Sequence, residues 1–339
     1  MRILLTTTSF QDTPGKHHEL LESTGYQIVR QRGPLPEDKM IELVTSGGPS
    51  GETSGETSGE TSGGGGGFDG ILHGDDALTR KVLEAALPRL KVLSKYGIGL
   101  DSVDVQAATE LKIPVLFTPG VNHTTVAEHA FGLMIMLAKH MNVEVNYVKA
   151  GQWKRITGSE LAGKTLGILG LGRIGKEVAK RAIAFDMNVI AYDVYWDEPF
   201  IAQYGVVKAK SAQAVAQQAD VLSLHMNLSN ENRGFVNKSL IAKMKDGAMI
   251  INCARGGLIV EADVADACRS GKLAGYAADV LDHEPMQPPH PFQTIDNIII
   301  TPHIGSRTFE SVERQALRAT QNLINYLEGN SDYIQANKF

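Results

Sequence analysis

The feature that most constrains this chain is a regular alternation of short apolar runs with helical segments. In the first third, apolar runs occupy residues 2–8, 26–32, 68–74, 91–97 and 114–119, and helical patterns occupy residues 16–24, 36–44, 78–87 and 103–111. Strands that are joined through helices run parallel, and the helices then cover both faces of the sheet. The alternation therefore predicts a doubly wound α/β domain.

The same alternation begins again after a long helical pattern at residues 124–151. Apolar strands or their flanks follow at residues 164–170, 177–185, 188–193, 221–226, 248–254, 275–280 and 297–303, and residues 306–329 form a last helical segment. We expect this last segment to return to the first domain. The predicted fold class is α/β with two doubly wound parallel-sheet domains and a cleft between them. One domain comprises residues 1–118 and 306–339, and the other comprises residues 119–305.

One segment, residues 46–67, interrupts the first domain between a helix and a strand. It contains only Gly, Ser, Thr, Glu and one Pro, with GETS three times in succession and then five glycines. Such connections usually take about 2–6 residues, and they emerge at the sheet edge opposite the ligand-binding edge. The composition is typical of a flexible, solvated linker, and the repetition has the appearance of an engineered replacement. The alternative is that Glu52, Glu56 and Glu60 form a cation site or an acidic docking tag.

Composition narrows the possible partners and the compartment. The net charge of −5 does not favour a nucleic-acid partner. Cys253 and Cys268 form no CxxC motif and have no histidine cluster beside them, so we expect no metal site and a reducing, cytoplasmic location. The most apolar run, residues 130–138, is too short to cross a bilayer, and the polar start does not resemble a signal peptide.

A glycine-rich turn at the start of the second domain predicts a dinucleotide site. Gly170, Gly172 and Gly175 form a G-x-G-x-x-G pattern directly after an apolar strand and before a helical segment. The glycines let the backbone approach a pyrophosphate, and the amides of Arg173 and Ile174 begin the helix that faces it. An ordinary glycine-rich turn is the alternative interpretation.

The choice of cofactor is predicted from Asp193, which ends the next strand, 18 residues after Gly175. A carboxylate at this position accepts hydrogen bonds from the ribose hydroxyls of NAD and repels the 2′-phosphate of NADP. We therefore expect NAD as the cofactor.

Three charged residues follow later apolar runs: Arg255 in INCARGG, Glu284 in DVLDHEP and His303 in TPHIG. Arginine binds a carboxylate through two parallel hydrogen bonds, and histidine transfers protons near neutral pH. A carboxylate beside the histidine favours its protonated form. Downstream of a dinucleotide motif, these residues predict hydride chemistry on a small 2-oxo or 2-hydroxy acid, with Arg255, Glu284 and His303 as the catalytic set.

Over nearly its whole length outside residues 46–67, the chain resembles the D-isomer-specific 2-hydroxyacid dehydrogenases. The motifs that carry the resemblance appear in the order of the family: KYGIGLDSVD, VAEHAFGLMIML, LAGKTLGILGLGRIG, INCARGG, DVLDHEP and TPHIG. The first of them is similar to the phosphoglycerate dehydrogenase branch. The resemblance implies a flavodoxin-like substrate domain, a Rossmann NAD domain, and a homodimer that is joined through the helix near residues 126–141.

The resemblance also implies roles for individual residues. Arg255 would bind the substrate carboxylate, Glu284 would tune His303, and His303 would transfer the proton. Amides of Ile98 and Gly99 would hold the carboxylate, and Asp279 would meet the nicotinamide amide. Further residues are implied at the substrate site (Lys95, Tyr96) and at the cofactor site (Val126, His225, Cys253, Ala254, Gly305).

Two departures from the family pattern affect these expectations. The family usually has a proline two residues after the histidine that matches His225, where this chain has Asn227. The phosphoglycerate dehydrogenase branch carries an arginine after the third strand to hold a phosphate, where this chain has Asp75 and Asp76. An acidic loop repels a phosphate. Basic residues after the first strand could compensate, although a solvated basic turn is the simpler interpretation; these are Lys16, His17 and His18.

The predicted function is NAD-dependent interconversion of a small D-2-hydroxy acid and its 2-oxo acid, with hydroxypyruvate, glyoxylate or a 3-phosphoglycerate-like compound as candidates. Formate dehydrogenases share the implied fold but pair their histidine with glutamine, so Glu284 argues against that activity. The alternative from another class is an NAD-sensing regulatory protein, similar to the corepressors of the family, with little turnover. A third possibility is an engineered carrier in which the insert is the functional part.

Overall fold

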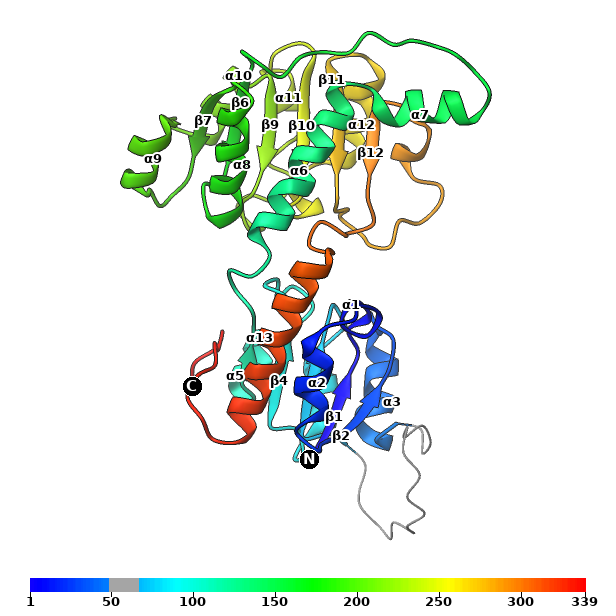
Figure 1. Cartoon of the computed structure of the whole chain (residues 1–339), viewed down its shortest axis with the longest axis vertical. Helices are drawn as coiled ribbons and strands as arrows, with labels where there is room; N and C mark the ends of the chain where they lie inside the picture. Colours follow the sequence, from blue (N-terminus) through cyan, green and yellow to red (C-terminus); the bar gives the residue numbers. More distant parts are fainter. Residues whose placement is uncertain (49–66) are drawn as a thin grey trace. The chain divides into compact units, whose positions relative to one another are not determined.

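A computed structural model describes residues 1–48 and 67–339. The chain divides into two compact units, which we describe separately. Unit 1 comprises residues 1–122 and 307–339, and unit 2 comprises residues 123–306 (Figure 1). The cleft expected between the domains stays a prediction.

Unit 1 is built on a five-stranded parallel sheet with the order β2-β1-β3-β4-β5. The strands are β1 (Arg2–Leu5), β2 (Gln27–Arg30), β3 (Gly70–His73), β4 (Val92–Lys95) and β5 (Val115–Leu116). The helices are α1 (Thr8–Asp12), α2 (Lys16–Glu22), α3 (Glu37–Ser46), α4 (Arg80–Ala86), α5 (Val105–Glu110) and the C-terminal α13 (Phe309–Leu327). The strand order reverses between β1 and β3, which is where ligands bind in sheets of this type.

Alternate residues of the central strands of unit 1 belong to two separate hydrophobic cores, one on each face of the sheet. Leu4, Ile71 and Leu93 pack with α3, α4 and α5, whereas their chain neighbours pack on the opposite face with α13. The C-terminal helix is an integral layer of this unit, since Leu323 is fully buried and the Ser94 hydroxyl donates to Ala319 O at 2.7 Å. Helix α13 therefore packs within unit 1.

Unit 2 contains a seven-stranded parallel sheet with the order β12-β11-β10-β9-β6-β7-β8. Its strands are β6 (Thr165–Leu169), β7 (Asn188–Tyr192), β8 (Val207–Lys208), β9 (Val221–Leu224), β10 (Ala248–Asn252), β11 (Leu273–Ala278) and β12 (Ile298–Ile300). Its α-helices are α6 (His123–Ala138), α7 (Met141–Lys149), α8 (Arg173–Ala184), α9 (Glu198–Tyr204), α10 (Ala212–Gln218), α11 (Lys238–Ile241) and α12 (Glu261–Arg269), with the short helices η1 (Gly256–Leu258) and η2 (Pro291–Thr294). The fold class predicted from the sequence, two doubly wound parallel sheets, is confirmed.

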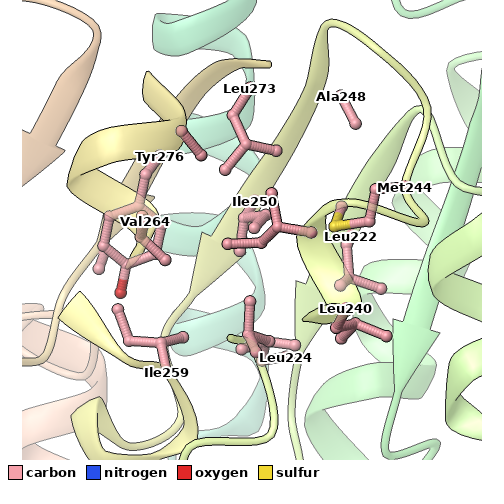
Figure 2. Packing of buried hydrophobic residues seen from close by; sticks show 14 of the residues in the cluster. Leu222, Leu224, Leu240, Met244, Ala248, Ile250, Ile259, Val264, Leu273 and Tyr276 are labelled. Carbon is pink, nitrogen blue, oxygen red and sulfur yellow. The ribbon is translucent and has the colours of Figure 1, made fainter. Parts of the chain in front are cut away.

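The two faces of the unit 2 sheet are covered by different helices. Ile250 of β10 packs with α10, α11 and α12, and Figure 2 shows this core around Leu222, Leu240 and Tyr276. Ile251, the next residue, points to the opposite face and packs with α6 and α8. Side chains on a strand alternate between faces, so a continuous apolar run supplies both cores at once.

The helical pattern at residues 124–151 forms two helices. It is divided into α6 and α7 at His140, whose φ of 54° places it in the left-handed region. The returning chain ends α6, because the Ser159 amide donates to Ala138 O at 2.8 Å and so satisfies a terminal carbonyl. None of the residues of α7 is buried.

The described residues contain neither a membrane-spanning helix nor a cluster of metal-ligating side chains. Among residues 1–48 and 67–339, no helix is both long and apolar enough to span a membrane. Over the same residues, no group of three or more His, Cys, Asp or Glu side chains is placed to hold a metal ion.

Candidate active site

The carboxyl ends of neighbouring strands in unit 2 bring most of the predicted site residues to one edge of the sheet. Along the order β7, β6, β9, β10, β11 and β12, these ends carry Asp193, the glycine turn, His225, Cys253 with Ala254, Asp279, and His303 with Gly305. Adjacent strands lie about 4.8 Å apart, so these residues form a row along the edge.

The three glycines of the turn after β6 have different steric surroundings. Gly170 has a φ of 95°, and a Cβ there would lie 2.7 Å from the carbonyl carbon of His225. A Cβ on Gly175 would lie 2.1 Å from Gly170 O, so only glycine lets α8 approach the strand. Among the described residues other than its chain neighbours, no atom lies within 4 Å of the Cβ position of Gly172, which precedes α8. The turn therefore leaves open space at the helix N-terminus that begins with Arg173 and Ile174.

Asp193 lies beside this turn, as the spacing predicts. Its Oδ2 accepts from the Leu171 amide at 2.6 Å, and its Oδ1 accepts from the Tyr195 amide at 2.9 Å. The carboxylate is thus fixed next to the glycine turn, with lone pairs remaining for further donors.

His225, after β9, and Cys253, directly after β10, are uncharged side chains at this edge. The ring of His225 contacts Ser223 Oγ through Nε2 at 2.8 Å, and burial lowers its pKa to about 4, so the ring is neutral at pH 7. Burial raises the pKa of the Cys253 thiol, which keeps it protonated. The loop that contains Asn227 closes on itself, since Asn227 O accepts from Asn232 Nδ2 at 2.8 Å.

Arg255 is brought to the Glu284 loop by the glycine that follows it. A Cβ on Gly256 would lie 1.9 Å from the carbonyl carbon of Leu281 and 2.2 Å from the amide of Asp282, so the two loops touch backbone to backbone. The Asn252 side chain donates to Arg255 O at 2.9 Å and so stabilises the loop that contains Arg255. Neither Gly256 nor Asn252 was singled out from the sequence, although both belong to the INCARGG motif.

Glu284 and His303 form a hydrogen-bonded pair. His303 Nδ1 lies 2.8 Å from Glu284 Oε2, while the Leu281 amide donates to Glu284 Oε1 at 2.9 Å. Because the carboxylate can only accept, Nδ1 carries the proton of this bond. The His303 side chain is 48% exposed and Glu284 35%, so the pair is accessible from solvent.

Asp279 is buried and fixes the turn that carries His303. Its carboxylate accepts from the Thr301 hydroxyl at 2.5 Å and from the amides of Ile304 and Gly305 at 2.9 and 2.6 Å. Burial alone would raise the pKa of Asp279, but these bonds and one from His129 outweigh it and hold that pKa below its ordinary value. Val126, the remaining cofactor candidate, is buried on α6. His129 has no role in the sequence prediction, and its only signal is a polar residue within the apolar run of α6.

The predicted substrate residues lie in unit 1, on and just after β4. Lys95 is 2% exposed, and its ammonium donates to Gly74 O at 2.5 Å and to Asp75 Oδ1 at 2.7 Å. Burial raises the pKa of Tyr96 to about 12. Within residues 1–48 and 67–339, no hydrogen-bond acceptor is recorded for the amides of Ile98 and Gly99, which follow Gly97 at a φ of 121°. Successive amides of this kind suit an anion.

The two carboxylates of the acidic loop after β3 have different surroundings. Asp76 is fully buried, and its carboxylate accepts from the Thr6 hydroxyl at 2.5 Å and from the amides of Leu35 and Gly74 at 2.8 and 3.2 Å. Asp75 is exposed but paired with Lys95. The loop therefore has one buried carboxylate that accepts hydrogen bonds and one exposed carboxylate in an ion pair.

The suggestion that basic residues after β1 hold a phosphate fails for His17. Its ring is fully buried, contacts Phe10 O through Nε2 at 3.0 Å, and packs edge-on against the Phe10 ring. Burial lowers its pKa, so it supplies no positive charge at neutral pH. The simpler interpretation of a solvated basic turn is also wrong for this residue.

Comparison with known proteins identifies relatives of this chain. The sequence pattern of the "D-isomer specific 2-hydroxyacid dehydrogenase, NAD binding domain" matches residues 131–305. The hydroxypyruvate reductase of Thermotoga maritima is 40% identical over 254 residues, which are 74% of this chain and 81% of that protein. The glyoxylate reductase of Thermofilum pendens is 36% identical over 78% of this chain and 79% of its own length.

A D-3-phosphoglycerate dehydrogenase of Archaeoglobus fulgidus is 37% identical over 76% of this chain, but the match covers 49% of that protein. The chain thus spans about half the length of this relative and of a second D-3-phosphoglycerate dehydrogenase. Among solved structures, the TT0316 protein of Thermus thermophilus has a TM-score of 0.85 at 33% identity, over 99% of this chain and 100% of that one.

Proposed function

Because this chain belongs to the D-isomer-specific 2-hydroxyacid dehydrogenases, we propose that it is an NAD-dependent reductase of a small 2-oxo acid, working reversibly on the D-2-hydroxy acid. The observation that carries this proposal is the Glu284–His303 pair, at 2.8 Å, on the same sheet edge as the glycine turn. One edge thus offers both a dinucleotide site and a proton donor.

The residues present fit NAD. The open space at Gly172 and the amides that begin α8 suit a pyrophosphate, and the Asp193 carboxylate beside the turn suits the ribose hydroxyls. Asp279 Oδ2 accepts one recorded amide, from Gly305, and so retains a lone pair for a carboxamide donor. When bound, the reduced cofactor supplies the hydride.

The side chains of this chain supply the rest of the reaction. In reduction, His303 gives the proton on Nε2 to the substrate carbonyl oxygen, and in oxidation it takes that proton back. Glu284 accepts from Nδ1 and stabilises the imidazolium that must be present before reduction. Arg255 binds the carboxylate and polarises the carbonyl oxygen through its guanidinium. In unit 1, the successive amides of Ile98 and Gly99 are donors of the kind that suit a carboxylate.

We favour an unphosphorylated substrate, such as hydroxypyruvate or glyoxylate. One cation close to the substrate loop is Lys95, whose Cε lies 3.8 Å from the Cβ position of Gly97. Its charge is matched by Asp75, and His73 behind it is neutral because burial lowers its pKa to about 3. Together with buried Asp76, this group has no excess positive charge with which to attract a phosphate.

A substrate panel tests the activity directly. NADH oxidation is followed with glyoxylate, hydroxypyruvate, pyruvate and 3-phosphohydroxypyruvate, and we expect turnover with at least one of the first two. No turnover with any of them, combined with tight NADH binding, supports the NAD-sensing alternative. The named reductases among the relatives favour the enzyme. The cytoplasmic location stays a prediction.

We also propose that the chain forms a homodimer through α7. Met141, Val145 and Val148 are 47%, 49% and 54% exposed and recur at the i, i+4, i+7 spacing of one helix face, and Trp153 beyond the helix is 79% exposed. This apolar stripe lies mostly beyond residues 126–141, the range expected from the sequence. Sedimentation analysis should give a dimer, and Val145→Glu should give monomers. Val207→Glu, at a residue 58% exposed elsewhere in unit 2, is the matched control.

A further inference from the structure

The turn that carries His303 rests on polar residues outside the proposed reaction. The Thr301 hydroxyl donates to Asp279 Oδ1 at 2.5 Å, and His129 Nε2 of α6 lies 2.9 Å from the Thr301 hydroxyl oxygen. His129 Nε2 also lies 3.4 Å from Asp279 Oδ1. These contacts connect α6 with the chain segment after β12.

The direction of each hydrogen bond follows from the proton inventory. A hydroxyl has one proton, and the short contact assigns it to the carboxylate, so Thr301 receives the His129 contact on its oxygen. His129 must then carry a proton on Nε2. Donation runs from His129 to Thr301 and from Thr301 to Asp279.

Asp279 connects these hydrogen bonds to the turn that contains His303. Its two oxygens accept the amides of Ile304 and Gly305, the two residues that follow His303. His303 has a φ of 54°, a left-handed conformation that residues other than glycine adopt only when their surroundings hold them. A Cβ on Gly305 would lie 2.8 Å from Asp279 Oδ2, so the contact is close enough to require glycine.

We infer that His129 and Thr301 are positioning residues that act through Asp279 to hold His303 in its reactive orientation. The inference rests on the proposed function only where turnover is the readout. Packing alone does not explain His129, because its side chain is 21% exposed and makes directed contacts. The other charged pair of this region, Glu128 with Arg181 of α8, lies outside the chain of donors. Cys253 stays neutral because burial raises its pKa.

Paired variants test the inference. His129→Leu and Thr301→Val remove a donor at nearly constant volume, whereas His129→Gln and Thr301→Ser keep one. We expect the first two to lower kcat by about tenfold to about 100-fold, the range for small misplacement of a reacting group. NADH affinity should change far less, and the acid limb of the pH profile of kcat/KM should move. His129→Gln and Thr301→Ser should restore most of the rate.

A second readout does not depend on turnover. Hydrogen exchange of the peptide that spans residues 302–306 should accelerate in His129→Leu and Thr301→Val and remain near that of the parent in His129→Gln. His290→Leu is the control, since His290 pairs with Glu261 at 3.2 Å in the same unit and has no recorded contact with the three residues.

The outcomes separate the inference from the proposed function. A parent protein without turnover on any 2-oxo acid removes the proposed function, while the exchange data still decide on the support of the turn. An active parent whose His129→Leu and Thr301→Val variants keep the parent kcat, pH profile and exchange overturns the inference. If both variants lose stability but keep activity, or if neither folds, the network is a structural element and the positioning role is rejected.

Discussion

The carboxyl edges of the two sheets use polar groups in opposite ways. In unit 1, Lys95 is paired with Asp75, and buried Asp76 accepts hydrogen bonds from Thr6, Leu35 and Gly74. In unit 2, the edge has open space at Gly172 and a half-exposed His303 ring. Both units follow one architectural plan, so the plan does not decide where ligands bind. The difference lies in the exposure of these groups, because Lys95 and Asp76 are buried whereas the His303 side chain is 48% exposed.

The strongest test of this contrast is the removal of the His303 ring. His303→Ala should lower turnover by about 10²- to 10⁴-fold, the range for a general acid–base group, and leave NADH binding within a few-fold. Steady-state rates and a fluorescence titration with NADH measure the two effects, with His290→Ala as the control. Near-parental turnover would remove His303 from the mechanism.

Cofactor preference should depend on the carboxylate beside the glycine turn. Asp193→Ala should narrow the preference for NADH over NADPH by roughly tenfold to 100-fold, because hydrogen bonds to a charged group are worth about 1.5–3 kcal/mol. The ratio of kcat/KM for the two cofactors is the measurement. If the parent protein already uses both equally, the assignment of Asp193 is wrong.

In unit 1, the contrast with unit 2 can be tested by removing one partner of the Lys95–Asp75 ion pair. Asp75→Asn leaves the Lys95 charge unmatched and should raise the rate with 3-phosphohydroxypyruvate relative to hydroxypyruvate. The expected change is up to about fivefold, since Asp75 is 73% exposed and such pairs are worth about 0.2–1 kcal/mol. Asp38→Asn, on the exposed side of α3, should leave the ratio unchanged. An unaltered ratio in Asp75→Asn would separate this pair from substrate choice.

Acid stability should differ between the units because their buried histidines differ. Burial lowers the pKa of His73 to about 3 and that of His225 to about 4, from 6.5. As the pH falls, the unfolded chain therefore binds protons at these histidines at a higher pH than the folded chain does. The contribution of the two neutral rings to the free energy of unfolding is fully present above about pH 6.5 and is lost as the pH falls. The contribution of His73 is up to about 1.4 kcal/mol per pH unit and extends to a lower pH than that of His225.

The comparison is measurable because both tryptophans, Trp153 and Trp196, lie in unit 2. Tryptophan fluorescence follows that unit, and circular dichroism follows both. His73→Asn keeps a donor for Gly74 O, which His73 Nδ1 contacts at 3.0 Å, but removes the titration. Its unit 1 transition should depend less on pH between about 6 and about 4 than that of the parent. Equal slopes in parent and variant would contradict the prediction.

The smallest expected effect concerns the insert. Its flexible-linker prediction falls on residues 49–66, which lie outside the described residues. The flanks meet, since the Cβ position of Gly47 is 3.3 Å from the Gly67 amide, and they join α3 to β3. Replacing residues 49–66 by about four polar residues should keep turnover within a few-fold. It should raise the free energy of unfolding by about 1.3 kcal/mol through loop entropy. Lost activity in a folded variant would assign the insert a function.

The sequence by itself determined the features that depend on nearby residues. Strand–helix alternation gave both parallel sheets, since each element is encoded by its own periodicity. The G-x-G-x-x-G turn and Asp193 were recognisable because a strand, a turn and a helix N-terminus follow one another directly in the chain. The Glu284–His303 pair spans 19 residues, and the sequence indicated it because both residues follow apolar runs that read as strands.

Only the tertiary structure decided which polar groups pair. The burial of His17 and Asp76, the Lys95–Asp75 pair and the break at His140 each depend on chain segments that meet after folding. His129 and Thr301 are 172 residues apart, and no local pattern links them. Hydrogen bonds act over about 3 Å, so their partners are set by which strand ends and helix faces the fold brings into contact.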